Sequence, residues 1–346
     1  MYKRTQTRAL KVGNVRVGAG ASVSIQTMGN ADAHDAAACL TQLESCAKLG
    51  CDIFRLAVPD AEAVNTFAEV RRRSPIPIVA DIHFDYRLAL AALEAGADAL
   101  RLNPGNIGGA ANIRAVAKAA KARGVPIRVG VNAGSLERGE TTVSSALKNI
   151  KLLEDEGFFD IAVSVKSSSV EATIADYREL ARQTDCPLHL GVTEAGTTLP
   201  GTVRSSLALG ILLNEGIGDT LRVSLTDRPE TEVKTALEIL RSLGLRAPGP
   251  SIVSCPTCAR TKVDLFSVAA AVEAELERYR FAKPDTKDVK VAVMGCAVNG
   301  PGEAKGADVA LCGGDGEFLL YVKGSQVCKV SEKDAVRKVM EYVVSL

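Results

Sequence analysis

The chain has 346 residues, of which 47% are apolar and 24% are charged, and its formal net charge is +1 at pH 7. This composition is that of a core-forming globular protein and excludes a disordered chain, and a charge so near zero gives no global field for nucleic acid or an anionic membrane. The N-terminal stretch MYKRTQTRALKVGNVRVG lacks the apolar segment of a secretory signal, and no run of about 18 apolar residues follows. We therefore expect a cytoplasmic protein that binds neither nucleic acid nor a membrane.

Eight short runs rich in β-branched residues alternate with alanine- and leucine-rich segments of helical periodicity. In chain order the expected strands are 23–28, 53–58, 78–83, 99–103, 127–132, 161–166, 188–194 and 221–225. Most of the intervening segments close on a glycine suited to a helix C-terminus. A strand followed by a helix, eight times over, predicts a (β/α)8 TIM barrel of the α/β class. A doubly wound parallel sheet is the structural alternative.

The pattern changes after residue 243. The proline- and glycine-bearing stretch 244–250 predicts a linker, which a helix near 262–280 and strands near 289–294, 307–311 and 318–322 follow. We expect two domains, a barrel over 1–245 and a small α+β domain over 246–346.

Polar side chains occupy the expected carboxyl ends of the barrel strands, where active sites of this fold lie. They are Arg55, Asp81, His83, Arg101, Asn103, Arg128, Asn132, Lys166, Glu194, Arg222 and Ser224. Any one of them could be a surface charge at a strand edge. Five cations at corresponding positions instead favour a substrate with more than one phosphoryl group, because arginine suits bidentate phosphate recognition.

Two weaker signals accompany these residues. The glycine-rich loop 103–109 could present backbone N–H groups to an anion. Of the three histidines, only His83 stands at a strand end beside a carboxylate, whereas His34 and His189 are expected in cap or core roles.

Nine cysteines in a chain this large are expected to be thiols or metal ligands rather than disulfides. Cys255 and Cys258 in SCPTCAR form a C-x-x-C pair, and Cys296 follows in MGCAVNGPGE. Such a pair can belong to a zinc site, a redox disulfide or an iron–sulfur site. A structural zinc site normally has a second close pair of ligands, and a redox disulfide normally lies in a βαβ unit; neither is present here. That leaves an iron–sulfur cluster, which needs four ligands, with three thiolates.

Two types of fourth ligand are open. Cys312 or Cys328 would complete an all-cysteine set, fit mainly for electron transfer. Glu303, which the Asn-Gly-Pro-Gly turn could swing back towards Cys296, would be a replaceable ligand that opens one iron to a substrate oxygen. The remaining cysteines are expected to be small core residues, namely Cys39, Cys46, Cys51 and Cys186.

Several motifs spread over nearly the whole chain carry a resemblance: SCPTCAR, MGCAVNGPGEA, FRLAVPD, ADIHF, LRLNPGN, RVGVNAGSLE, SVKSS, HLGVTEAG and LRVSLT. Together they resemble the 4-hydroxy-3-methylbut-2-en-1-yl diphosphate synthase family, iron–sulfur oxidoreductases of the methylerythritol phosphate route to isoprenoids. The resemblance implies a [4Fe–4S] cluster held by Cys255, Cys258, Cys296 and Glu303. It also implies reductive dehydration and ring opening of 2-C-methyl-D-erythritol 2,4-cyclodiphosphate to 4-hydroxy-3-methylbut-2-enyl diphosphate, with electrons from a flavodoxin or ferredoxin.

The resemblance further implies roles for single residues. Phosphate contacts fall on Arg55, Arg101, Arg128, Lys166 and Arg222, helped by His83, Asn103, Asn132 and Ser224. Glu194 faces the reacting carbons, and Asn299 lies beside the cluster. Some relatives carry an inserted middle domain, for which this chain has no room, so it resembles the short two-domain bacterial form. The alternatives are an iron–sulfur sensor or carrier fused to a metabolite-binding barrel, and a zinc-dependent barrel transferase.

Topology adds an expectation about assembly. Each barrel helix runs antiparallel to its strand, so a last helix ending near Leu243 delivers the chain to the face opposite the active-site mouth. To return to the active-site mouth, the linker would have to span roughly 20 to 30 Å along the barrel, and fully extended it reaches only about 30 Å. We therefore expect a head-to-tail homodimer with an active site shared between chains, which the resemblance also implies.

Overall fold

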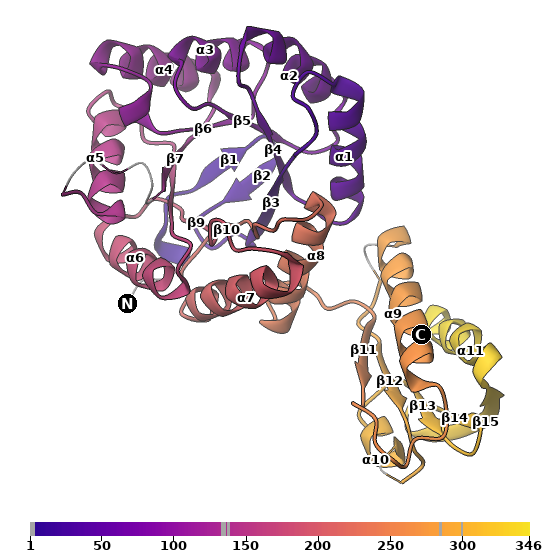
Figure 1. Ribbon diagram of the computed structural model, residues 1–346. Helices are drawn as coiled ribbons and strands as arrows, with labels where there is room; N and C mark the ends of the chain where they lie inside the picture. Colours follow the sequence, from indigo (N-terminus) through magenta and orange to yellow (C-terminus); the bar gives the residue numbers. More distant parts are fainter. Residues whose placement is uncertain (1–3, 133–135, 137–138, 284–285, 299) are drawn as a thin grey trace. The chain divides into compact units, whose positions relative to one another are not determined.

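The computed structural model describes residues 4–132, 136, 139–283, 286–298 and 300–346, without the side chains of Arg4, Asn132 and Glu303 (Figure 1). The chain divides into two compact units, Met1–Arg246 and Ala247–Leu346. No helix in the described ranges is long and apolar enough to cross a membrane.

The first unit is the predicted barrel. Its strands are β3 (Ser24–Met28), β4 (Ile53–Ala57), β5 (Ile78–Asp81), β6 (Ala99–Leu102), β7 (Ile127–Asn132), β8 (Ile161–Lys166), β9 (His189–Leu190) and β10 (Thr220–Leu221). They are parallel and hydrogen-bonded in the order β8-β7-β6-β5-β4-β3-β10-β9, and a bridge between Val163 and Leu188 joins the two ends. The expected TIM barrel is thus confirmed. The last two strands are shorter than expected because the chain leaves the regular ladder once past Leu190 and Leu221.

Eight helices ring the strands (Figure 1). They are α1 (Ala36–Lys48), α2 (Ala61–Arg73), α3 (Tyr86–Glu94), α4 (Ala110–Arg123), α5 (Thr142–Glu154), α6 (Val170–Gln183), α7 (Thr198–Asn214) and α8 (Pro229–Ser242). Several begin where a side-chain oxygen accepts a backbone N–H, as Asp35 does for α1, Asp60 for α2 and Ser169 for α6. Short 3₁₀ turns cover Arg4–Gln6 and Pro104–Asn106.

A β-hairpin that the sequence patterns did not indicate precedes the barrel. Its strands are β1 (Leu10–Val12) and β2 (Val15–Val17), seen inside the ring in Figure 1. Their buried side chains form one apolar cluster with residues that begin β4, β5, β6 and β8, such as Ile53 and Val79. The hairpin therefore closes the barrel at the amino ends of its strands, which leaves the carboxyl ends for a ligand.

The second unit is a five-stranded mixed sheet with three helices. Its strands are β11 (Ser251–Ser254), β12 (Lys290–Met294), β13 (Val309–Gly313), β14 (Glu317–Val322) and β15 (Ser325–Ser331), in that spatial order, and its helices are α9 (Leu265–Ala282), α10 (Gly300–Ala304) and α11 (Glu332–Ser345). Strands β11, β12 and β13 pair in parallel, and β14 is antiparallel to both of its neighbours, β13 and β15. Helices α9 and α11 cover one face in one apolar core, and α10 lies on the other. The sequence patterns missed β11, β15 and α11; β15 is a mostly exposed polar edge strand without an apolar alternation.

Candidate functional site

Strand register places most of the predicted polar residues side by side towards the carboxyl ends of the barrel strands, but Arg128 is the second of the six residues of β7 and begins nearer the amino end than expected. Met28 is the register partner of Arg55, and Arg101 is the partner of both Asp81 and Arg128. The inward-facing cationic side chains of five strands therefore converge. We call the group of Arg55, Asp81, Arg101, Arg128, Lys166 and Arg222 the cation cup.

Asp81 is the carboxylate at the centre of the cation cup. Its side chain is 2% exposed, and its oxygens lie 3.2 Å from His83 Nε2, 3.4 Å from Arg101 Nη1 and 3.9 Å from Arg55 Nε. Burial alone would raise the pKa of Asp81, but the neighbouring Arg55, His83 and Arg101 hold that pKa well below its usual range. Asp81 is therefore an anion that ties its three neighbours together.

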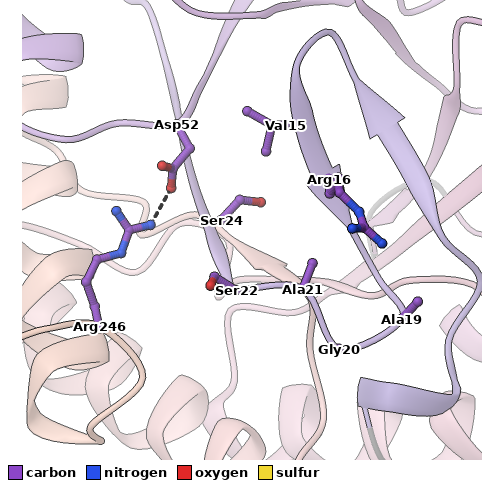
Figure 2. Close-up of a pocket in the computed structure, with 9 residues that line it drawn as sticks. All are labelled: Val15, Arg16, Ala19, Gly20, Ala21, Ser22, Ser24, Asp52 and Arg246. Atoms are coloured by element: carbon purple, nitrogen blue, oxygen red, sulfur yellow. Dashed lines mark hydrogen bonds and ion pairs between the residues drawn. The ribbon is translucent and has the colours of Figure 1, made fainter.

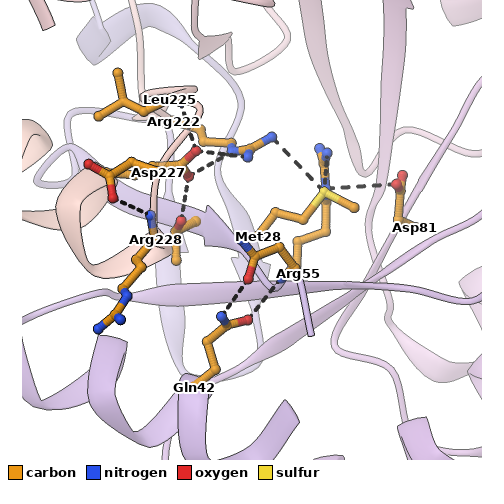
Figure 3. Close-up of polar contacts among 11 residues, drawn as sticks. Met28, Gln42, Arg55, Asp81, Arg222, Leu225, Asp227 and Arg228 are labelled. Atoms are coloured by element: carbon orange, nitrogen blue, oxygen red, sulfur yellow. Dashed lines mark hydrogen bonds and ion pairs between the residues drawn. The ribbon is translucent and has the colours of Figure 1, made fainter. Parts of the chain in front are cut away.

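Arg55 is held from the other side by a thioether. Its Nη2 lies 2.7 Å and its Nε 3.0 Å from Met28 Sδ, which also lies 4.0 Å from Arg222 Nη1 (Figure 3). Sulfur is a weak acceptor, so it orients the guanidinium without neutralising it. Burial lowers the pKa of Arg55 to about 10, with Asp81 opposing the shift and Arg222 adding to it.

Arg222 is anchored by a carboxylate that the sequence patterns did not point to. Glu232, 3% exposed in the first turn of α8, accepts from Arg222 Nη2 at 3.0 Å and from Nε at 3.1 Å. It also accepts from Thr27 Oγ1 at 2.7 Å and from the backbone N–H of Leu225 at 3.0 Å. With four donors on its two oxygens, Glu232 fixes both the guanidinium and the chain that follows β10.

Arg128 and Lys166 are buried cations that pair with none of the described residues. They are 6% and 7% exposed, and the three guanidinium nitrogens of Arg128 are buried without a hydrogen-bond partner. Burial lowers the pKa of both groups well below their usual values, and nearby cations such as Arg55 and Arg101 lower them further. Buried charge of this kind is costly unless a counter-ion arrives.

Two glycines give the long cationic side chains room to lie against the barrel wall. A Cβ on Gly130 of β7 would stand 2.5 Å from Arg101 Nε, and one on Gly191 would stand 2.8 Å from Lys166 Nζ and 2.8 Å from the carbonyl oxygen of Arg222. A side chain at Gly191 would clash with backbone, whereas one at Gly130 would force the end of the Arg101 side chain to move. The sequence patterns gave no sign of this role.

The other predicted site residues fall into three groups. Asn103 is buried and accepts from the N–H of Gly105 at 3.1 Å, an N–H that Asn149 also binds at 2.8 Å, so that group of the glycine-rich loop is engaged within the protein. Ser224 is half-buried beyond β10, and Glu194 is exposed with a φ of 51°, which is uncommon for a residue with a side chain. Asn132 ends β7 opposite Lys166, but its side chain and the whole of Asn299 lie outside the described residues.

The cation cup is built to receive an anion. Its described side chains supply five cations, and only Asp81 and Glu232 oppose them, which leaves an excess of three positive charges. Arginine forks and an ammonium group in a largely buried site bind phosphoryl oxygens strongly. The charge suits a doubly phosphorylated small molecule better than a single carboxylate.

The predicted metal ligands of the second unit share one end of its sheet. Cys255 follows β11 directly, Cys258 lies three residues further on, and Cys296 stands two residues past β12, the parallel neighbour of β11. The backbone N–H of Gly295 donates to Cys255 Sγ at 3.2 Å. Cys255 and Cys296 are half-buried and Cys258 is exposed. All three residues follow the carboxyl ends of the parallel neighbours β11 and β12, at one end of the sheet.

The two alternative cysteine ligands differ in position. Cys328 lies on β15, four strands away from β11, which is roughly 19 Å at ordinary strand spacing. Cys312 is fully buried beneath α10, where its Sγ would stand 2.8 Å from a Cβ placed on Gly300. Cys328 is therefore too distant to join the other three thiols, and Cys312 is already packed within the core.

The donor set of this edge fits an iron–sulfur cluster. Within the described ranges no three His, Cys, Asp or Glu side chains stand as a ready-made metal-binding group. Three thiols at one sheet edge are nonetheless the soft donors that iron–sulfur clusters take. Glu303 belongs to α10, which packs on β12 and β13, and its side chain lies outside the described residues.

The remaining cysteines lie in the core and His34 contacts a helix-capping residue, as expected, whereas His189 is in the core with its Nε2 lacking a hydrogen-bond partner among the described residues. The four barrel cysteines Cys39, Cys46, Cys51 and Cys186 are buried in the main apolar core. His34 bridges Asp32 and the helix-capping Asp60, at 3.0 Å from each. His189 is fully buried inside the barrel.

A separate pocket of about 420 Å³ lies at the amino end of the barrel (Figure 2). Arg16 of the hairpin lines one side, and the ion pair of Asp52 with Arg246, at 2.6 Å, lines the other. Ser22 and Ser24 lie between them. The pocket shares no residue with the cation cup.

Comparisons with known proteins agree with both units. Residues 7–237 match the GcpE TIM-barrel domain family, and residues 251–345 match the GcpE protein C-terminal domain family. A 4-hydroxy-3-methylbut-2-en-1-yl diphosphate synthase (flavodoxin) of Clostridium acetobutylicum is 48% identical over 351 residues, covering 99% of each chain. A protein of the same name from Geobacter sulfurreducens is 51% identical over 341 residues, covering 96% of this chain and 95% of its own.

Among solved structures, the dihydropteroate synthase of Yersinia pestis superposes with a TM-score of 0.51 at 13% identity, covering 68% of this chain and 98% of its own. At that identity the likeness concerns the barrel fold alone. The family matches over both units and the near full-length identities are decisive: this chain belongs to the GcpE family, that of the 4-hydroxy-3-methylbut-2-en-1-yl diphosphate synthases.

Proposed function

We propose that this chain is an iron–sulfur oxidoreductase that converts 2-C-methyl-D-erythritol 2,4-cyclodiphosphate into 4-hydroxy-3-methylbut-2-enyl diphosphate. The observation that carries the proposal is the cation cup, whose excess of positive charge matches a cyclic diphosphate, in a chain of the GcpE family. The reaction takes up two electrons and two protons, breaks one bond between a ring carbon and a diphosphate oxygen, and removes a hydroxyl group as water, which forms an isoprenoid precursor.

The cation cup holds the diphosphate. Arg128 and Lys166, which are buried without partners among the described side chains, gain the phosphoryl oxygens as counter-ions. Arg55, Arg101 and Arg222 are already oriented by Met28, Asp81 and Glu232, so they bind without a further loss of side-chain freedom. The same groups stabilise the negative charge that ring opening leaves on the diphosphate. His83, Asn103, Asn132 and Ser224 complete the contacts around the substrate.

The second unit holds a [4Fe–4S] cluster through Cys255, Cys258, Cys296 and Glu303. The support is the shared sheet edge of the three thiols, the place of Glu303 in α10, and the distance of Cys328 from that edge. When bound, such a cluster supplies electrons singly and an iron that acts as a Lewis acid. We assign Asn299 to the surroundings of the cluster.

Glu194 is the barrel residue that we assign to proton transfer at the reacting carbons. It stands exposed in the loop after β9, on a backbone held in the left-handed region. The N–H of Thr193 donates to the carbonyl of Ser167 at 3.1 Å and holds this loop to the end of β8. Strained backbone of this kind recurs where a loop must hold one functional side chain in place.

The active assembly is a head-to-tail homodimer whose active site is shared between chains, and a flavodoxin is the electron donor. An apolar stripe along α7 supports an association of chains, because Leu199, Val203, Leu207 and Ile211 recur at every fourth position and are all exposed. The curated relatives carry flavodoxin in their names.

Turnover of the cyclodiphosphate tests the function. The protein is reconstituted with iron and sulfide without oxygen, supplied with reduced flavodoxin, and assayed for the linear diphosphate. Arg101→Ala removes a cation from the cup and should lower kcat/KM by about 100-fold or more. Arg114→Ala, a matched change at an exposed arginine on the outer face of α4, should leave it unchanged. A wild-type enzyme that leaves the cyclodiphosphate untouched refutes the proposal.

Iron content tests the ligand set independently of turnover. Cys296→Ser should lose most of the bound iron and the visible absorption of the cluster, because a thiolate donor is removed. Cys312→Ser, at the buried cysteine beneath α10, should keep both. If Cys312→Ser loses iron as fully as Cys296→Ser, Cys312 rather than Glu303 is the fourth ligand.

A further inference from the structure

A small cavity lies inside the barrel between Arg128 of the cation cup and the hairpin that closes the floor. Its volume is about 30 Å³, and hairpin residues such as Val17 form its floor. Gln26 of β3, Arg128 of β7 and His189 of β9 contribute its polar walls, and Ile53 and Val79 contribute apolar ones. One water molecule needs about 10 to 15 Å³ of probe-occupied space, so the cavity has room for at least one.

Three buried side chains bring unsatisfied polar atoms to this cavity. Gln26, Arg128 and His189 are 5%, 6% and 0% exposed. Gln26 Oε1, His189 Nε2 and all three guanidinium nitrogens of Arg128 find no hydrogen-bond partner within the described part of the chain. A buried polar group left without a hydrogen bond is destabilising, so three neighbouring side chains of this kind indicate a bound species.

The chemistry of these atoms selects water over an anion. The Gln26 oxygen accepts hydrogen bonds only, and Arg128 only donates them. His189 is neutral, since burial and the nearby Arg128 lower its pKa well below the ordinary value. Its Nδ1 lies 3.4 Å from Thr220 Oγ1, and when Nδ1 donates there, Nε2 is a second acceptor. Water can accept from Arg128 and donate to both acceptors, whereas a halide would face two acceptors.

We propose that Gln26 and His189 are positioning residues for Arg128, acting through water held in this cavity. The water fixes the edge of the guanidinium that faces the floor and leaves the remaining N–H groups to the cation cup. The water also keeps the guanidinium solvated while the cup stands without substrate. The consequence for catalysis rests on the proposed function, in which Arg128 binds a phosphoryl group.

A high-resolution crystal structure of the whole protein tests the water directly. The proposal expects a density peak within hydrogen-bond distance of Arg128, Gln26 and His189. Crystals grown in bromide instead of chloride provide the control, since an anomalous peak in the cavity identifies a halide and overturns the proposal. A dry cavity overturns it equally. This readout needs no turnover, so it decides the inference even if the proposed reaction fails.

Kinetics test the positioning role. Gln26→Met and His189→Leu remove one acceptor each and should raise KM for the cyclodiphosphate about tenfold with kcat within about twofold, because Arg128 is less well held before substrate binds. His189→Gln retains an acceptor and should stay near wild type. Ile53→Val changes the volume of the same cavity without a polar atom and should leave KM unchanged.

Circular dichroism and iron content confirm that each variant is folded and loaded. The role is refuted if His189→Gln and His189→Leu are equally impaired, or if Ile53→Val raises KM as much as Gln26→Met does. If one variant does not fold, the comparison at the other position still decides.

Discussion

Asp81 determines how the cationic residues can coexist. A single buried carboxylate within 4 Å of Arg55, His83 and Arg101 offsets part of their mutual repulsion and gives each of them a fixed direction. Without it, the guanidinium groups of Arg55 and Arg101 would repel each other without a carboxylate between them. The carboxylate therefore orders the site before any substrate is present.

The stability that Asp81 contributes should depend on pH. Its folded-state pKa is lowered, so its contribution is fully present above the unfolded-state value of about 3.9 and is lost as pH falls through the folded-state pKa. At pH 7 Asp81→Asn should lower the free energy of unfolding of the barrel by about 3 kcal/mol, as for other buried charge pairs that lose one partner.

Denaturant unfolding of wild type and variant at neutral pH and at successively lower pH measures this difference. The difference in free energy of unfolding between wild type and Asp81→Asn should become smaller once the pH falls below about 4. Asp155→Asn, at an exposed carboxylate paired with Lys151, should change little at any pH. A difference that stays constant down to pH 2 would mean that Asp81 stabilises the barrel by packing rather than by charge.

The sequence allowed a site role to be predicted for a single residue only where its position in the strand–helix repeat put it towards the end of a strand. Arg101 and Lys166 end expected strands, and barrel topology alone brings strand ends together. Glu232 and Met28 were not predictable, because Glu232 meets Thr27 from 205 residues away and a thioether carries no recognisable pattern. The role of Gly130 depends on how the Arg101 side chain bends, which strand periodicity does not encode.

Among the secondary-structure elements, the β1–β2 hairpin has the clearest structural task. It seals the barrel floor with Leu10, Val12 and Val17, all nearly buried. Its short three-residue strands carry too few alternating positions to stand out in the sequence, whereas the longer barrel strands do. The same reason explains why β15, exposed along most of its length, escaped prediction.

Truncation in the hairpin should destabilise the barrel from its floor. Leu10→Ala removes a side chain that is 5% exposed and should lower the free energy of unfolding by about 2 to 5 kcal/mol through lost burial and a new cavity. Lys11→Ala, the next residue on the same strand but exposed, provides the matched control. Denaturant unfolding followed by circular dichroism gives both values. Equal values for the two variants would show that the hairpin does not seal the core.

At the scale of the whole molecule, each unit has an apolar core of its own. The barrel core and the core shared by α9, α11 and their sheet have no residue in common. The proposed chemistry needs groups from both units, so the enzyme has to bring a cation cup and a cluster together. The sequence patterns predicted the existence of both units because their periodicities differ.

Mixed dimers test whether two chains build one active site. Cys296→Ser should abolish the cluster in one chain, and Arg101→Ala should weaken the cation cup in the other. Each variant alone should be inactive, whereas a mixture that exchanges subunits should regain about a quarter of the wild-type activity if half of the dimers are mixed and each holds one intact site. Mass spectrometry of differently tagged chains checks that exchange occurred. Exchange without recovered turnover contradicts a site shared between chains.

The absent side chains at Gly130 and Gly191 set limits on protein engineering. In a library aimed at new substrates, a side chain at Gly130 would displace the end of Arg101, and one at Gly191 would still meet the carbonyl oxygen of Arg222 after Lys166 had been shortened. His83 and Ser224, which are more exposed, offer starting points for such a search. Substitutions that adapt this barrel to other diphosphates are thus expected among the exposed residues at its mouth rather than in the wall beneath.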